Sequence, residues 1–552
     1  MVADCFVEYF TGIAQGIDDS GLLKLTEEQL RDFKSVQDIR DSMRIVNGPK
    51  FSSSKVSQTE VQSALANLNT NNSYGHDGLS NKVLKLVGGA LVPSLTKIFN
   101  TCIDENYWPV EWKRGDWVPV YKKDNPRDVR NYRPMTVLST LGKVFEQLLG
   151  KQLTIFMEPR LNRNLTAYRK KNSCEITLVK LVGDWKWTLD NKHVIGILST
   201  DLSKAYDSLH PPLLLAKLWA YGFSESAIDM RCYFTERKNR VRMRSGDFSE
   251  WRETSRGCPQ GSNLGPLLWN IFQNDLVQNI HTDRLAMYAD DHQVYSAGQK
   301  TEDVETILND EGTRTSEWYQ QNLLKCNQDK FHALSLGPGH KKKRMNLNIK
   351  EINIKSSSGI DLLGVAIDDD LNFTKHINNV CTKGERKVGV LMRFRNLMPT
   401  EAKLRIFKAF ILPQVTYRHI VLHHCRSSDE RKLKRLQERA MRAIYCDRAS
   451  TYEALLDKAR LPTLCNRRLQ DMAIFMCKVK TNLVPPYISE RFSCGISRYN
   501  LRNADDFYLP RYNTVTYGRH SLRNQFKRDV TTETAKDAFT RILEGGDDKE
   551  SP

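Results

Sequence analysis

An uninterrupted apolar run that ends in an acid constrains the fold of this chain more than any other feature. Residues 194–198 read Val-Ile-Gly-Ile-Leu, and a short β-branched run of this kind is typical of a strand buried on both faces. Asp201 follows this run, at a point where a strand ends and a side chain can face a cleft. The run therefore predicts a central strand of a covered sheet, with a carboxylate at its end.

A second acidic motif lies further along the chain. Apolar residues at 285–288 lead into Ala289, Asp290 and Asp291, and Val294 and Tyr295 lead out. This pattern predicts a hairpin with the acid pair at its tip, although the usual glycine-containing turn is missing. An isolated Asp-Asp pair, in a chain with 27% charged residues, is usually a solvated turn, and the apolar flanks argue against that alternative.

The three carboxylates point to metal-assisted chemistry. Carboxylates gathered in one place repel each other, so a pKa rises unless a cation shares the site. Two divalent ions held by such groups stabilise the attacking and leaving oxygens of an in-line phosphoryl displacement. We therefore expect Asp201, Asp290 and Asp291 to hold two divalent cations.

A glycine- and proline-rich loop at 256–266 separates the two acidic motifs. Apolar residues then recur at helical spacing from Leu267 to Leu276, which predicts that the loop opens a helix. Such a loop lets backbone approach a sugar or base closely, and its N–H groups favour phosphate. Gln260 and Gly261 at its centre are candidate nucleotide contacts.

Cations flank these motifs. Lys122 and Arg133 precede the first acid and suit the charges of a nucleoside triphosphate, since Arg offers a bidentate fork and Lys a point charge. Lys330 is a candidate proton donor to a leaving pyrophosphate. Each of these residues is also compatible with an ordinary solvated surface cation.

The order of the motifs resembles that of the reverse transcriptases of non-LTR (LINE-like) retrotransposons over roughly residues 60–450. The matching segments, in order, are Gly-His-Asp-Gly at 75–78, Asn-Tyr-Arg-Pro at 131–134 with Lys143 and Glu146, Ala-Tyr-Arg-Lys at 167–170, the Asp201 motif, Pro-Gln-Gly at 259–261, Tyr-Ala-Asp-Asp at 288–291, Lys330, and Leu-Leu-Gly-Val at 362–365. The resemblance implies that Asp201, Asp290 and Asp291 bind two Mg²⁺ ions, with Mn²⁺ as a substitute, and that Lys122 and Arg133 meet the triphosphate.

The resemblance also implies an α+β right-hand polymerase with fingers, a palm with an antiparallel sheet, a helical thumb, and helical N- and C-terminal extensions. The expected segments are a helical pre-polymerase part at 1–95, fingers at 96–192, palm at 193–370 (with a reverse transcriptase core at about 113–370), thumb at 371–485, and an irregular region at 486–552 with a disordered acidic tail. Tyr206 is expected to lie against the sugar of the incoming nucleotide, where an aromatic ring would clash with a 2′-hydroxyl. A core tyrosine is the alternative.

Composition favours a polyanionic partner. The net charge is +18, and phosphate neutralisation drives sequence-independent nucleic-acid binding. Arg240, Arg242 and Arg244 alternate along a predicted strand, and Lys434, Arg435 and Arg442 load the polar faces of a predicted helix at 429–445. Both sets are candidate nucleic-acid contacts, and a solvated strand edge or helix face is the alternative for each.

The remaining features exclude other classes. No apolar stretch approaches the length of a membrane span, and the N-terminal residues, with Asp4 and Glu8 and no basic stretch, are not typical of a signal peptide. We therefore expect a nuclear or cytoplasmic protein that is not secreted. The twelve cysteines lack paired spacing, which favours reduced thiols. No cysteine follows Cys494, so the C-terminal zinc knuckle of many relatives is not expected.

These observations predict an RNA-directed DNA polymerase that extends a DNA primer on an RNA template with dNTPs. Residues 1–95 are too few for the endonuclease that usually precedes such a domain, so we expect a copy that lacks it. One alternative is an inactive or domesticated relic that acts only as a basic nucleic-acid-binding protein. Another is an RNA-synthesising palm polymerase, against which Tyr206 argues.

Overall fold

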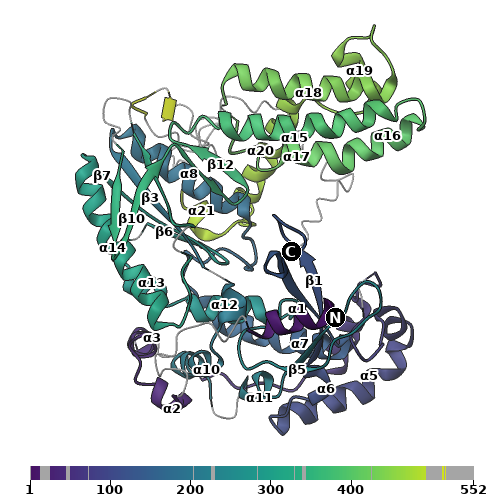
Figure 1. Ribbon diagram of the computed structural model, residues 1–552, viewed down its shortest axis with the longest axis vertical. Coiled ribbons are helices and arrows are strands. Elements are labelled where there is room, and N and C mark those ends of the chain that lie inside the picture. Colours follow the sequence, from purple (N-terminus) through teal and green to yellow (C-terminus); the bar gives the residue numbers. More distant parts are fainter. Residues whose placement is uncertain are drawn as a thin grey trace, which may run out of the picture. The chain divides into compact units, whose positions relative to one another are not determined.

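The structure is a computed structural model with an α+β fold (Figure 1). It describes residues 2–12, 25–44, 50–71, 74–202, 204–224, 230–282, 284–327, 330–337, 344–423, 425–492, 512–514 and 516–517. The chain divides into two compact units, the first made of Met1–Leu165, Thr200–His292 and Glu311–Lys330, the second of Thr166–Ser199, Gln293–Asp310 and Phe331–Pro552.

Helices make up most of the secondary structure described in the first unit. They are α1 (Val2–Gly12), α2 (Glu27–Leu30), α3 (Lys34–Arg44), α4 (Gln58–Ala66), α5 (Asn81–Asp104), α6 (Val110–Lys113), α7 (Thr140–Met157), α9 (Ala205–Ser208), α10 (Pro211–Ala220), α11 (Met230–Phe234), α12 (Gly265–Gln273) and α13 (Leu276–Asn279). The C-terminal half of α14 (Thr301–Gln321) also belongs here.

The first unit contains a four-stranded sheet in the order β2-β1-β4-β5. Its strands are β1 (Arg114–Tyr121), β2 (Tyr132–Leu138), β4 (Lys238–Val241) and β5 (Arg252–Glu253). β1 pairs antiparallel with β2 and parallel with β4. Phe6 and Phe10 of α1 pack on this sheet against Trp117 and Val241. The apolar residues of α1, which recur at helical spacing, thus cover a sheet face that would otherwise be exposed to water.

A six-stranded sheet has the order β6-β7-β3-β8-β10-β9. Its strands are β3 (Val194–Asp201), β6 (Leu285–Tyr288), β7 (Asp291–Gly298), β8 (His332–Leu336), β9 (Asn346–Ile349) and β10 (Ile352–Ser357). β3 pairs antiparallel with β8, but β10 pairs parallel with β8. The expected antiparallel palm sheet is therefore wrong in this detail: β10, the second strand of the β9–β10 hairpin, lies beside β8, so the sheet is mixed.

The second unit continues with helices. They are α8 (Cys174–Asp190), the N-terminal half of α14, α15 (Thr374–Arg393), α16 (Thr400–Ile406), α17 (Leu412–Thr416), α18 (Ser427–Tyr445), α19 (Tyr452–Ala459), α20 (Leu464–Lys480) and α21 (Pro486–Ser489). A hairpin of β11 (Gly359–Leu362) and β12 (Val365–Asp368) turns at Leu363 and Gly364, which both have positive φ. That is the geometry of a tight two-residue hairpin turn.

Several expected elements are confirmed. The buried run at 194–198 lies within β3. The predicted helix at 429–445 is α18, and its apolar stripe is buried, including Leu433, Leu436 and Met441. Most of the region predicted to be irregular, 486–552, lies outside the described residues, and the proposed domain boundaries stay predictions.

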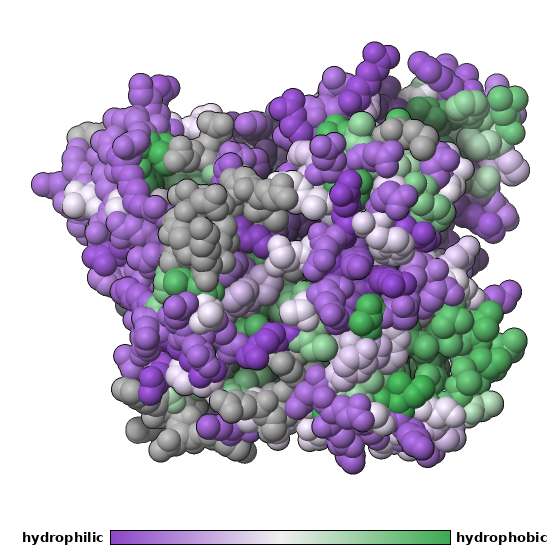
Figure 2. All heavy atoms as spheres, turned by 60° about the horizontal axis from the view of Figure 1, so that its bottom comes forward, coloured by the Kyte–Doolittle hydropathy of each residue, from purple (hydrophilic) through white to green (hydrophobic). Residues whose placement is uncertain are grey.

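Helix α5 corrects one expectation from the sequence. It is long and apolar enough, by length and composition, to cross a membrane, which the sequence analysis had excluded. One side packs on α4, where Gly88 lies against Leu65. The other side exposes apolar residues, and Leu86 is 85% exposed. Figure 2 shows apolar surface gathered on this side of the molecule, at the lower right.

A fully buried ion pair lies among α10, α13 and α14. The Lys217 ammonium and the Asp275 carboxylate are 2.6 Å apart, and neither side chain is exposed. Lys217 also donates to the Phe272 carbonyl, and the Trp318 indole N–H donates to the other oxygen of Asp275 at 2.7 Å. Each charge is thus matched by an opposite charge and by further hydrogen bonds, as burial requires.

Candidate active site

The two acidic motifs lie at the ends of neighbouring elements of the sheet. Asp201 is the last residue of β3, and Asp291 is the first residue of β7. Only residues 289–290 connect β6 to β7, which are neighbours in the sheet, so these strands form the predicted hairpin. Ala289 takes a positive φ of 55°, and its carbonyl accepts a hydrogen bond from Trp269 Nε1 at 3.0 Å. The indole of α12 therefore holds the turn that presents Asp290 and Asp291.

Asp290 and Asp291 lie close enough to Asp201 for its charge to affect their ionisation. Burial, together with the negative charges of Asp290 and Asp201, raises the pKa of Asp291 to about 6. Burial also raises the pKa of Asp290, with Asp201 adding to the effect. The structure thus brings the predicted acids into one electrostatic field, which is the situation that a bound cation relieves.

Predicted cations share this field. Lys330 Nζ contacts Asp201 Oδ1 at 2.8 Å, and the backbone N–H of Asn327 donates to the Asp201 carbonyl, which fixes the segment that carries Lys330. Burial lowers the pKa of Lys122, and the positive charges of Arg133 and Lys330 lower it further. Lys122 and Arg133 lie at the end of the β1–β2 ladder that residues 122–131 connect, where Val120 pairs with Arg133.

The donor chemistry fits divalent cations. Carboxylate oxygens are the ligands that Mg²⁺ prefers, and the Lys330 ammonium already occupies one oxygen of Asp201. Within the described ranges, no three His, Cys, Asp or Glu side chains are gathered as a preformed metal cluster. The fit to a divalent cation therefore rests on the negative charges of the three acids and on the contact of Asp201 with a positive group, the Lys330 ammonium.

The loop at 256–266 lies against β2 and α9. Gly261 has a φ of 136°, and a Cβ there would stand 2.3 Å from the Thr136 carbonyl oxygen, so glycine is required. The Thr136 N–H donates to the Gln260 carbonyl at 2.8 Å, and Gln260 Nε2 donates to both oxygens of Asp207 at 2.9 Å. The predicted loop and the segment after Asp201 are thus joined through Asp207.

Tyr206 of α9 contacts both the loop at 256–266 and helix α12. Its ring packs on the Trp269 indole, with ring centroids 5.4 Å apart, and the Cys258 N–H donates to its backbone carbonyl. Trp269 in turn holds the hairpin turn at Ala289. One indole therefore supports both the predicted sugar contact and the acid pair.

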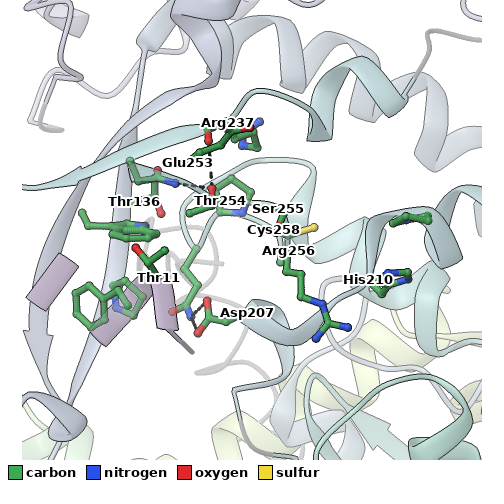
Figure 3. Close-up of a pocket in the computed structure, with 18 residues that line it drawn as sticks. Thr11, Thr136, Asp207, His210, Arg237, Glu253, Thr254, Ser255, Arg256 and Cys258 are labelled. Carbon is green, nitrogen blue, oxygen red and sulfur yellow. Dashed lines mark hydrogen bonds between the residues drawn. The ribbon is translucent and has the colours of Figure 1, made fainter. Parts of the chain in front are cut away.

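A cavity of about 600 Å³ opens beside this loop (Figure 3). Residues from β2, α9 and the loop line it, among them Thr136, Asp207, Arg256 and Cys258. In Figure 3 the hydroxyl of Thr254 donates to the carbonyl of the adjacent Arg237. The cavity adjoins the candidate nucleotide contact Gln260, which is one of its lining residues.

The loop at 256–266 is also held by residues whose role no sequence pattern indicated. Glu146 of α7 is 2% exposed, and its carboxylate accepts from the Asn263 N–H at 2.6 Å and from the Tyr233 hydroxyl at 3.1 Å. The Tyr233 hydroxyl also bonds Ser262 Oγ at 2.8 Å. Glu146 stood in the sequence only as part of the resembled motif, and no local pattern predicted that it would bind a loop 117 residues away.

The predicted nucleic-acid contacts fall into two groups. Arg240 and Arg242 both donate to Asp116, at 2.9 and 3.3 Å, and Asp116 is 1% exposed. They therefore have a structural role that the sequence did not reveal, because Asp116 lies on a different strand. Arg244 lies beyond the end of β4 and is exposed. The binding role of all three stays a prediction.

The cations of α18 also differ from one another. Arg442 donates to Glu438 and to the carbonyls of Arg448 and Ser450, so it closes the end of the helix. Lys434 is 3.5 Å from Glu453 in an exposed ion pair. Arg435 is exposed and makes no ion pair or hydrogen bond with another residue that the structure describes.

Comparison with known proteins identifies the class. Residues 120–367 match the family model of reverse transcriptases (RNA-dependent DNA polymerases), a range that includes both acidic motifs and the loop between them. This part of the chain is a reverse transcriptase domain.

The relatives narrow the class further. The chain is 25% identical to the probable RNA-directed DNA polymerase from transposon X-element of Drosophila melanogaster, over 70% of this chain and 43% of that protein. It is 25% identical to the RNA-directed DNA polymerase from mobile element jockey of the same species, over 71% of this chain and 44% of that protein. A Pol polyprotein from the type-1 retrotransposable element R1 of Bradysia coprophila is 27% identical over 60% of this chain and 33% of that protein.

These matches confirm the LINE-like reverse transcriptase predicted from the sequence motifs. The chain spans less than half the length of these curated relatives.

Proposed function

We propose that this protein is an RNA-directed DNA polymerase that extends a DNA primer on an RNA template. The observation that carries the proposal is the shared electrostatic field of Asp201, Asp290 and Asp291, within a segment that matches reverse transcriptases. The β1–β2 ladder and α7 correspond to the fingers in this proposal, the six-stranded sheet to the palm, and α15 to α20 to a helical thumb.

In this proposal the acids bind metal ions, and the cations bind the triphosphate and donate a proton. Asp201 and Asp290, assisted by Asp291, would hold two Mg²⁺ ions, which when bound activate the primer hydroxyl and stabilise charge on the departing pyrophosphate. Lys122 and Arg133 bind the triphosphate by charge and by bidentate hydrogen bonding. Lys330 is the nearest ammonium to Asp201 and supplies a proton to the leaving group. Catalysis then consists mainly of positioning and charge stabilisation.

Selection of the sugar is assigned to Tyr206. The Trp269 indole supports its ring from one side, so the ring cannot retreat to admit a larger sugar. A 2′-hydroxyl would then clash with the ring, and dNTPs would be preferred over rNTPs. The partners in this proposal are an RNA template, a DNA primer and dNTPs.

The test is primer extension by the full chain on poly-rA with an oligo-dT primer, Mg²⁺ and dTTP. We expect Asp290→Ala to reduce extension by about 10³-fold or more, because a ligand that stabilises transition-state charge is lost. Binding of the primer–template, measured by fluorescence anisotropy, should remain within about threefold of wild type. Asp303→Ala, at an exposed acid in the first turn of α14, is the matched control and should extend normally.

Equal extension by wild type and Asp290→Ala would contradict the metal-site assignment. A wild-type chain that binds the primer–template and extends nothing would instead support the relic that only binds nucleic acid. Comparison of dTTP with UTP incorporation separates the DNA polymerase from an RNA-synthesising relative.

A further inference from the structure

A chain of buried hydrogen bonds lies directly behind the candidate active site. We call Thr200, Tyr319, His292 and Gln273 the Tyr319 network. Thr200 Oγ1 lies 2.7 Å from the Tyr319 hydroxyl, and that hydroxyl lies 2.6 Å from His292 Nδ1. His292 Nε2 lies 2.8 Å from Gln273 Oε1. All four side chains are at most 2% exposed.

The network connects the two strands that carry the acids. Thr200 immediately precedes Asp201 on β3, and His292 immediately follows Asp291 on β7. Successive side chains of a strand point to opposite faces of the sheet. Thr200 and His292 therefore lie on one face, where Tyr319 of α14 bridges them, and Asp201 and Asp291 are presented on the other.

The proton positions within the network follow from its chemistry. Gln273 Oε1 can only accept, so His292 Nε2 donates to it. A neutral imidazole that carries its proton on Nε2 leaves Nδ1 as an acceptor. The Tyr319 hydroxyl then donates to Nδ1, and Thr200 donates to the Tyr319 oxygen. Every hydrogen bond in this series is satisfied in one direction only, which holds the rings in a single arrangement.

We propose that the Tyr319 network is a positioning device that sets the separation of Asp201 and Asp291 for binding divalent cations. This inference rests on the proposed function, and it assigns to Tyr319 a role that neither a motif nor a local pattern indicates. The reason is mechanical: the tyrosine hydroxyl hydrogen-bonds side chains of both strands directly beside their acids. The backbone ladder between β3 and β7 remains without this hydroxyl, but the strand ends lose their side-chain cross-link, so the spacing of the carboxylates is fixed less tightly.

Tyr319→Phe removes the bridging oxygen and little else. We expect Mn²⁺ affinity of the full chain without substrate, measured by electron paramagnetic resonance, to fall about 10–100-fold, as for other groups that orient metal ligands. In primer extension kcat should fall about tenfold or more, and KM for dTTP should stay within about twofold. Tyr221→Phe is the matched control, because Tyr221 is also buried and its hydroxyl accepts from Asn274 Nδ2 at 2.8 Å, away from the acids.

Substitutions at Thr200 separate positioning from stability. Thr200→Ser keeps the donor and should behave like wild type in Mn²⁺ binding. Thr200→Val keeps the shape and removes the donor, so it should weaken Mn²⁺ binding in the same way as Tyr319→Phe. Tyr221→Phe should lose a similar free energy of unfolding, measured by urea denaturation, with no change in Mn²⁺ affinity or kcat.

The outcomes separate this inference from the proposed function. Wild-type Mn²⁺ affinity and kcat in Tyr319→Phe would overturn the positioning role and leave the polymerase proposal standing. An equal loss of Mn²⁺ affinity in Tyr319→Phe and Tyr221→Phe would also overturn it, because general loosening would then explain both. Failure of the wild type to extend a primer, with Mn²⁺ binding still dependent on Tyr319, would contradict the polymerase proposal alone.

Discussion

Asp207 links the segment after the first acid to the loop between the two acidic motifs. Its carboxylate accepts both hydrogen bonds that Gln260 Nε2 donates, at 2.9 Å each. Burial raises the pKa of Asp207 to about 6, although the hydrogen bond from Gln260 opposes the rise. Its contact with the candidate nucleotide contact Gln260 gives Asp207 a structural role in holding the loop.

The raised pKa of Asp207 predicts a pH-dependent stability. The folded value of about 6 exceeds the unfolded value of about 3.9, so the native state binds more protons between these values. Stability from this group is present below about pH 4 and is lost as the pH rises to about 6. Relative to Asp207→Asn, the wild-type free energy of unfolding should fall by about 1–3 kcal/mol across this window. Urea denaturation at several pH values without divalent cations measures it, and parallel curves for the two proteins would contradict it.

Sequence reasoning at this scale found the residues that have diagnostic neighbours. Asp201, Asp290 and Asp291 stand beside apolar strands, so their flanks revealed them. Tyr319 lies in a helix 119 residues from Thr200, where a tyrosine reads as an ordinary core residue. Its role depends on contacts with Thr200 and His292 that form only in the folded chain, so the local sequence around Tyr319 could not predict them.

The ion pair of Lys217 and Asp275 ties three helices of the first unit together. Both charges are fully removed from water, so the pair adds little net stability but is costly to break. Trp318 of α14 donates to the same carboxylate, which extends the connection to the helix that carries Tyr319. The region behind the acids therefore depends on charge matching inside the protein.

Breaking this pair should be strongly destabilising. We expect Lys217→Met to reduce the free energy of unfolding by about 3–5 kcal/mol, because it leaves the buried Asp275 charge without a partner. Lys217→Met combined with Asp275→Asn should recover more than half of that loss, since no charge remains and Asn still accepts from Trp318. Lys34→Met, in the exposed pair with Asp38, is the control and should cost about 0.5 kcal/mol or less. A loss of that size for Lys217→Met would refute the expectation.

Elements were predictable where the local sequence pattern alone decided them. The strand at 194–198 follows from its uninterrupted apolar run, and α18 follows from the helical spacing of its apolar stripe. Pairings between distant elements were not predictable. The parallel contact of β8 with β10 and the packing of α1 on the four-stranded sheet depend on which neighbours meet in space.

For the whole molecule, the net charge of +18 predicts binding to nucleic acid that weakens steeply with salt. The logarithm of affinity for a primer–template should fall linearly with the logarithm of salt concentration. If Arg435 contacts a phosphate, Arg435→Gln should reduce the slope by about 1. Anisotropy titrations over a salt series provide the measurement.

The control for this experiment lies on the same helix. Arg442 already binds Glu438 and two backbone carbonyls, so Arg442→Gln should lower stability and leave the salt slope unchanged. Equal slopes for wild type and Arg435→Gln would remove Arg435 from the proposed binding surface. Asp290→Ala should bind with the wild-type slope, because its effect is confined to chemistry.

The outer side of α5 has a consequence for handling the protein in solution. Val83 and Leu86 are exposed there, and Lys82, Lys85 and Lys97 are the only charged side chains between Asn81 and Ile103. The positive charges of these lysines oppose association of two molecules through this apolar surface, and a high salt concentration screens that repulsion. A salt concentration high enough to remove bound RNA during purification is therefore also expected to favour aggregation. Adding a mild nonionic detergent should prevent the aggregation while the RNA is still removed.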